Sequence, residues 1–186
     1  MLVLPGSPDV HRLTVFADYY QFYLQDLQAY LEWLGSQGTD PDLPPAGWTS
    51  EAVDIHRIGV EPNSLSVGTA RNDWVEAVLR FHPGEPHAWA TGAQHVVEAD
   101  LDVPNGDLAV YGPTVDPDHG HHISITRGRY RVRVSYVPSG PSATEASGAG
   151  YGDHFMYHVD LWPTTTETQL VVLKQGPNPW AGQARR

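Results

Sequence analysis

The amino-acid sequence predicts a mainly β protein, organised as a single-domain antiparallel β-sandwich with one or two short helices in the N-terminal third. Apolar and polar residues alternate with a period of two in most segments, as they do in half-buried strands. About nine such segments are separated by turn residues, in a chain with 18 Gly and 16 Pro among 186 residues. Runs of short strands without long intervening helices favour a sandwich over a βαβ fold.

The N-terminal part contains an expected strand at 13–17 and then a stretch rich in aromatic and amide residues at 19–26. Alternation along this stretch predicts that Phe22 and Leu24 pack in the core. The opposite face would carry Gln21, Tyr23 and Gln25. Tyrosine combines a large rigid ring with a polar tip and is common in interfaces. We therefore expect this polar face, which leads directly into Asp26, to meet a partner.

Helix signals begin where that stretch ends. Asp26 is a typical N-cap residue, and the leucines within 27–34 recur with helical spacing. Gly35 and Gly38 are expected to end the helix. Together with the Pro-rich residues that follow, this helix makes up a helical and Pro-rich segment at 26–47.

A second, short helix is expected through 51–53, with Thr49 or Ser50 as its N-cap. The Gly-, Ser- and Ala-rich segment 138–152 is expected to be a mobile loop. No composition shift marks a domain boundary, so residues 1–186 are taken as one domain. The termini at 1–10 and 176–186 are expected to be flexible.

Two segments, 97–103 and 130–136, are expected to be neighbouring strands. Each carries charge on alternate positions, acidic in the first and basic in the second. Paired side by side, they would set Arg129, Arg131 and Arg133 opposite Glu98, Asp100 and Asp102. Each exposed cross-strand pair would contribute roughly 0.2–1 kcal/mol. Further strands are expected at 65–70, 75–81, 108–111, 122–126, 155–161 and 170–174.

The chain is acidic, with 22 Asp and Glu against 11 Lys and Arg and a net charge of −11. Residues 1–62 hold nine of the acidic and two of the basic side chains, a net charge of −7. Such a field repels phosphate backbones and anionic headgroups, so neither direct nucleic-acid binding nor membrane binding is expected. A basic protein partner would be steered toward the N-terminal third.

The absence of cysteine excludes disulfides, thiolate metal sites and a thiol nucleophile. No run of apolar residues approaches the ~20 needed for a membrane span. The first residues lack the basic start and the long apolar core of a secretory signal. These features predict a cytoplasmic protein.

Catalytic and metal-binding motifs are weak. His119, His121 and His122 are the best metal candidates, but histidines in a loop bind metals poorly unless a fold fixes them. His154 and His158 fall in an expected strand, where residues four apart lie roughly 13 Å apart. No Gly-x-Ser-x-Gly elbow or phosphate-binding loop is present. We therefore expect no cofactor and no enzymatic activity.

Three motifs occur in a fixed order: Tyr20-Gln21-Phe22 followed by Asp26, then Gly-Trp-Thr-Ser-Glu-Ala at 47–52, then a strand ending in Arg-Asn at 64–72. In this order the chain resembles the competence protein J family, mainly over residues 13–82 and more weakly at 128–132. The resemblance implies a small intracellular inhibitor of a DNA-entry nuclease, or an immunity-like protein. The 26–47 segment is longer than in that family, so the partner of this chain can differ from that of the family.

The leading hypothesis is an acidic binding protein that blocks a basic partner, a nuclease or nuclease toxin. Carboxylates would mimic nucleic-acid phosphates around an aromatic patch. The expected partner-binding residues are Tyr20, Tyr23, Asp26, Tyr30, Trp33, Asp40, Asp42 and Glu51. With six Trp and nine Tyr, a carbohydrate-binding β-sandwich is an alternative, and a His-ligated metal-dependent enzyme is a second one.

Overall fold

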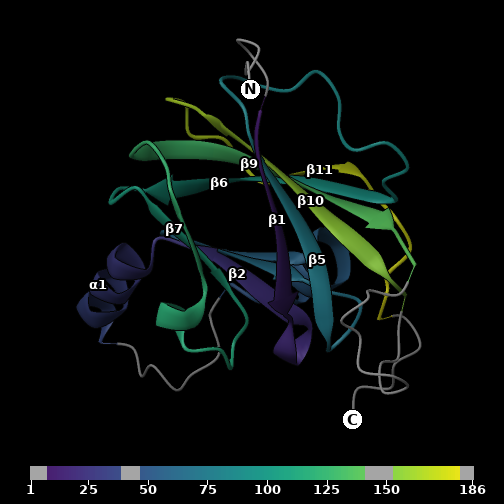
Figure 1. Cartoon of the computed structure of the whole chain (residues 1–186), viewed down its shortest axis with the longest axis horizontal. Helices are drawn as coiled ribbons and strands as arrows, with labels where there is room; N and C mark the ends of the chain where they lie inside the picture. Colours follow the sequence, from purple (N-terminus) through teal and green to yellow (C-terminus); the bar gives the residue numbers. More distant parts are fainter. Residues whose placement is uncertain (1–7, 39–46, 141–152, 181–186) are drawn as a thin grey trace.

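The computed structural model describes residues 8–38, 47–140 and 153–180. Two sheets pack face to face, which confirms the predicted sandwich (Figure 1). The six-stranded sheet has the order β1 (Asp9–Phe16), β5 (Trp74–Phe81), β10 (Phe155–Pro163), β9 (Gly128–Pro138), β6 (His95–Val103), β11 (Val171–Lys174). The five-stranded sheet has the order β3 (Ile58–Glu61), β4 (Ser64–Gly68), β2 (Gln21–Gln25), β7 (Asp107–Tyr111), β8 (His121–Ser124).

One neighbouring pair departs from the expected antiparallel arrangement. The chain leaves β5, forms β6 to β9 and returns as β10 between β5 and β9. In that position β10 is antiparallel to β9 but parallel to β5. Every other pair in the described part of the chain is antiparallel.

The core lies between the two sheets and is built by strand alternation. Phe22 and Leu24 of β2 are fully buried, as predicted, and they belong to the same cluster as Val132 and Val134 of β9. Phe22 also meets Tyr157 of β10 edge to face, with ring centroids 5.8 Å apart. The outer faces of both sheets are therefore free to carry polar side chains.

The strand expected over 19–26 is shorter than predicted. Asp18–Tyr20 form a 3-10 turn instead, and both tyrosines of this turn have positive φ angles, 51° for Tyr19 and 59° for Tyr20. Left-handed backbone does not continue a β-strand, so β2 starts at Gln21 and ends at Gln25. The turn thus places Tyr20 outside strand β2.

The expected helix is present as α1 (Leu27–Gln37). The Asp26 carboxylate accepts a hydrogen bond from the Ala29 N–H, and Gly38 ends the helix with a left-handed φ of 62°. The second expected helix is a single π turn at Ala52–His56, with the Thr49 hydroxyl accepting from the Ala52 N–H at 3.1 Å. A third short turn, Pro117–His119, was not expected.

The pairing of β6 with β9 has the register predicted from charge alternation. Glu98, Asp100 and Asp102 stand opposite Arg133, Arg131 and Arg129 respectively. Glu98 accepts from both Arg133 Nε at 2.6 Å and Arg131 Nε at 3.2 Å. Asp102 binds Arg129 through two contacts of 2.8 and 3.0 Å.

These ion pairs were expected to be exposed, and for the central ones that expectation is wrong. Glu98, Arg131 and Arg133 are each less than a tenth exposed. The reason is that other segments cover them: Arg133 donates to the Pro86 carbonyl and Arg131 to the Gln169 carbonyl. The ladder therefore fixes two connecting segments as well as two strands.

The segment after β11 crosses from the six-stranded sheet to the five-stranded one. The Arg57 guanidinium donates to the Gly176 carbonyl at 2.6 Å, and the Trp180 indole donates to the Thr69 carbonyl at 2.9 Å. The Gly176 N–H in turn points to Nδ1 of His95 at 3.4 Å. Residues 176–180, part of the terminus predicted to be flexible, thus make specific hydrogen bonds, and 181–186 lie outside the described residues.

Removing the carboxylate shared by two arginines should be costly. Glu98→Ala leaves Arg131 and Arg133 short of their buried partner, and we expect the free energy of unfolding to fall by about 3–5 kcal/mol. Glu167→Ala is the matched control, because the Glu167 side chain is 83% exposed and pairs with Arg129 at 3.4 Å. Urea unfolding should show a change of less than about 1 kcal/mol for this control. Equal effects for the two variants would contradict a structural role for the buried ladder.

The free energy of unfolding should depend on pH through His95. Burial, and then the Arg57 guanidinium, lower the pKa of His95 to about 4, against about 6.5 in an unfolded chain. Between these values only the unfolded chain binds the proton, so stability is lost as the pH falls. Urea unfolding should give a free energy about 2 kcal/mol lower at pH 5 than at pH 7 from this group. His95→Gln should reduce that pH dependence, and an unchanged slope would refute it.

Candidate protein-binding surface

The outer face of the five-stranded sheet carries the polar side of β2. Gln21, Tyr23 and Gln25 alternate with the core residues of this strand. Their cross-strand neighbours on β4 are small, with Ser66 opposite Tyr23 and Ser64 opposite Gln25. Small neighbours leave room for large side chains from other elements to pack on this face.

Helix α1 lies beside β2 and β7 and supplies those side chains (Figure 1). The Tyr30 hydroxyl donates to the Glu61 carboxylate at the end of β3, at 2.9 Å. The Trp33 ring lies 5.7 Å from the Tyr30 ring, centroid to centroid. Tyr23 and Tyr111 meet edge to face at 5.4 Å. We call Tyr23, Tyr30, Trp33 and Tyr111 the aromatic cluster.

Two rings of the aromatic cluster, Tyr23 and Tyr30, lie near one carboxylate, that of Glu61. Burial, and then the nearby Glu61 carboxylate, raise the pKa of Tyr23 to about 12. Burial and the hydrogen bond to Glu61 raise the pKa of Tyr30, and burial followed by the proximity of Tyr23 raises that of Tyr111. All three phenols therefore stay neutral at physiological pH. Tyr23 and Tyr30 are only half-buried, so the cluster presents aromatic surface beside a negative charge.

The position of the cluster depends on a set of hydrogen bonds made by Asp26, which we call the Asp26 joint. Its carboxylate accepts from the Ala29 N–H at 3.2 Å, the Asn105 N–H at 2.7 Å and the Asn105 side-chain amide at 3.0 Å. Its own N–H donates to the Asn63 carbonyl at 3.0 Å. Asp26 thus ties the end of β2, the start of α1 and two turns together.

Asp26 and Gln25 were expected to face a partner, but both are buried, and this expectation is corrected. Asp26 is 1% exposed and Gln25 is 2% exposed. Gln25 donates to the Ser64 hydroxyl at 2.9 Å and accepts from the Tyr111 hydroxyl. Both side chains are consumed by internal hydrogen bonds, so they hold the surface in place rather than contact a partner.

The remaining expected binding residues fall in different places. The structure brings Tyr23, Tyr30 and Trp33 together in the aromatic cluster. Tyr20 lies outside it, in the turn before β2. Glu51 lies just before the π turn, with its carboxylate 3.6 Å from His56 Nε2. Asp40 and Asp42 lie outside the described residues.

Two members of this surface, Glu61 and Tyr111, are not among the binding residues expected from the sequence. Tyr111 ends an expected strand, and its alternation with the core residue Val110 already placed it on the polar face. Glu61 belongs to β3, a four-residue strand that was not predicted. Its contact with Tyr30 joins residues 31 positions apart in the chain, and nothing in the local pattern signals such a pairing.

The three metal candidates point to different partners. His122 bridges the Asp107 carboxylate at 2.9 Å and the Pro117 carbonyl at 3.0 Å. His121 contacts the Thr14 carbonyl at 3.1 Å, and His119 lies 3.6 Å from Asp116. Among residues 8–38, 47–140 and 153–180, no group of three or more His, Asp or Glu side chains could hold a metal ion. Within the same ranges no helix is long and apolar enough to cross a membrane.

The fold of this chain matches that of ComJ-like proteins. One solved structure with this fold is ComJ from Bacillus subtilis, described as an inhibitor of the DNA degrading activity of NucA. It aligns with a TM-score of 0.58 and 14% identity, over 87% of this chain and 100% of ComJ. A second is a protein described as crocagin biosynthetic gene J, with a TM-score of 0.54, 14% identity, and 84% and 98% of the two chains covered.

Comparisons of sequence alone give no relatives. No protein-family model matches the chain, and no curated protein sequence matches it either. At 14% identity the likeness to the two solved structures is one of fold.

The Asp26 joint predicts a large loss of stability on mutation. Asp26→Ala removes the N-cap of α1 and leaves the Asn105 N–H without its acceptor, so the free energy of unfolding should fall by about 2–4 kcal/mol. Asp18→Ala is a suitable control, because the Asp18 carboxylate accepts one exposed hydrogen bond, from Tyr19 N–H. Urea unfolding followed by circular dichroism would measure both. A loss below about 1 kcal/mol for Asp26→Ala would rule out the joint.

Proposed function

We propose that this protein is a cytoplasmic inhibitor or immunity protein that binds and blocks a basic partner, a nuclease or nuclease toxin, and has no enzymatic activity of its own. The observation that carries the proposal is the fold likeness to ComJ, which extends over the whole ComJ chain. ComJ inhibits a DNA-degrading activity, so a nuclease is the partner class that this likeness supports.

Charge supports the same partner. A nuclease must attract the phosphate backbone of its substrate, so its binding face is rich in Lys and Arg. This chain carries a net charge of −11, and its first 62 residues carry −7. Carboxylates such as Glu51, Asp40 and Asp42 would compete with phosphate for that face and raise the association rate at low salt.

The aromatic cluster supplies the binding affinity that charge alone does not. Interface hot spots are dominated by aromatic and Arg side chains in the centre of the contact, while charges at the rim act mainly on the association rate. Trp33 and Tyr30 on α1, with Tyr23 of β2, present half-buried rings, and the Tyr30 hydroxyl donates to Glu61. In this proposal the three rings provide most of the binding affinity. Tyr20 lies at the edge of the contact.

The partner can be sought directly. The tagged protein, used as bait in a lysate of its native host, should retain a nuclease or toxin domain in stoichiometric yield. Adding the purified protein to that nuclease should stop DNA degradation, with an association rate that falls as salt rises. Recovery of glycans or of no basic protein would contradict the proposal, and glycan binding would favour the carbohydrate-binding alternative.

The residues of the contact can be tested on the captured nuclease. Trp33→Ala should weaken binding at least tenfold, as expected for loss of a central aromatic side chain. Leu31→Ala is the matched control, because Leu31 lies on the same helix and is 54% exposed. Isothermal titration calorimetry of both variants would measure the difference. Equal affinities for the two variants would place the contact elsewhere on the protein.

A further inference from the structure

The turn between β1 and β2 holds an exposed tyrosine in an unfavourable backbone conformation. Tyr19 and Tyr20 both have left-handed φ angles, which cost free energy for residues other than glycine. The Tyr19 side chain is 70% exposed, so burial of its ring does not offset this cost. Such outliers concentrate at functional sites, where a fixed side-chain position is needed.

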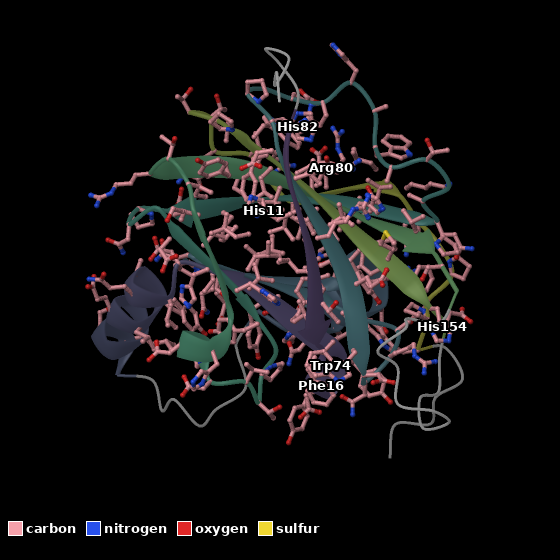
Figure 2. The ribbon with its side chains drawn as sticks, in the orientation of Figure 1. His11, Phe16, Trp74, Arg80, His82 and His154 are labelled. Atoms are coloured by element: carbon pink, nitrogen blue, oxygen red, sulfur yellow. The ribbon has the colours of Figure 1, made fainter. Side chains whose placement is uncertain are left out.

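Further rings lie at the same end of the sandwich. Figure 2 shows Phe16 and Trp74 next to each other, and their ring centroids are 5.3 Å apart. Trp74 is 42% exposed. The Ala17 N–H donates to the Asp73 carbonyl at 3.0 Å, which ties the start of the tyrosine turn to the residue before Trp74.

The charges next to these rings are negative, and the exposed Arg12 stands farther along the same face, opposite Val78. Glu76 follows Trp74 by two residues on the same face of β5, and both line a small hollow together with Asp153 and His154. Asp18 lies in the turn itself. Arg71, which also lines the hollow, is 5% exposed and stands 3.8 Å from the Asp73 carboxylate. We call Phe16, Asp18, Tyr19, Trp74 and Glu76 the turn surface.

We propose that the turn surface is a second docking site, which receives an arginine side chain from an extended basic segment of the partner protein. A guanidinium is planar, stacks on an indole ring and donates paired hydrogen bonds to a carboxylate. Trp74 and Glu76 offer these two features side by side. A lysine ammonium, more strongly hydrated and unable to form the paired bonds, fits this surface less well.

This docking site specifies which side chain of the partner is recognised, an arginine. It rests on the proposed function only in that the basic segment belongs to the inhibited partner. The site is separate from the aromatic cluster, since it lies at the end of β1, in the turn before β2 and on β5, whereas the cluster lies on α1, β2 and β7. The turn sets the backbone of Tyr19 in one conformation, which limits the backbone entropy lost on binding.

The test uses the full protein and a fluorescein-labelled arginine–serine peptide, with the lysine–serine peptide as its counterpart. Fluorescence anisotropy should show tighter binding of the arginine peptide. Trp74→Ala should weaken this binding about fivefold, and Glu76→Gln should weaken it as well. The matched control is Trp89→Ala, because Trp89 is 43% exposed and lies in a different hollow with Glu85 and Leu173.

A second variant separates binding from folding. Tyr19→Gly relieves the left-handed strain, so its melting temperature should rise by about 2 °C while peptide binding weakens. A structural role for Tyr19 would instead lower the melting temperature, which would overturn the proposal.

Other outcomes would also overturn it. Equal binding of the two peptides, or equal effects of Trp74→Ala and Trp89→Ala, would indicate attraction by net charge alone. Sedimentation showing a dimer that Trp74→Ala dissociates would make a second copy of this chain the occupant. Nuclease inhibition, measured separately, fails or succeeds independently of these peptide results, so the failure of one proposal is distinguishable from that of the other.

Discussion

The carboxylate of Asp26 is the constraint on which the arrangement of the candidate surface depends. It is buried at the point where β2 ends and α1 begins, and it accepts three hydrogen bonds from Ala29 and Asn105. Strand β2 carries Tyr23, and helix α1 carries Tyr30 and Trp33. Without a fixed angle between strand and helix, Tyr23 and Tyr30 would not meet beside Glu61. One buried acid thus converts two sequence-adjacent elements into a single surface.

Acidic side chains serve two purposes in this protein, and burial separates them. Glu98 and Asp26 are buried, satisfied by arginine or by N–H donors, and act in the fold. Glu51 and Glu76 keep contact with solvent and remain able to attract a cationic partner. The number of acidic residues therefore overstates how many carboxylates a partner can meet, because Glu98 is paired with arginines inside the six-stranded sheet and Asp26 is buried against N–H donors. The aromatic cluster and the turn surface are places where ring and carboxylate occur together near solvent.

Local patterns in the sequence were sufficient for much of the fold. Alternating charge gave the register of β6 against β9, and the cap at Asp26 with the glycines after it gave α1. Alternation assigns a side chain to a face, but it does not say what covers that face. For this reason the central ion pairs and Gln25 were expected at the surface and are buried. The strain at Tyr19 and the contact of Tyr30 with Glu61 arise from tertiary structure, which no local pattern encodes.

In the proposed complex a basic nuclease meets the surface built by β2, α1 and the end of β3. Hydrogen–deuterium exchange, compared between the free protein and its complex with the captured nuclease, can locate this contact. We expect slower exchange in the complex along α1 and around Tyr23 and Glu61, with little change on the outer face of β6 and β9. Unchanged exchange in α1, with protection confined to the six-stranded sheet, would contradict it.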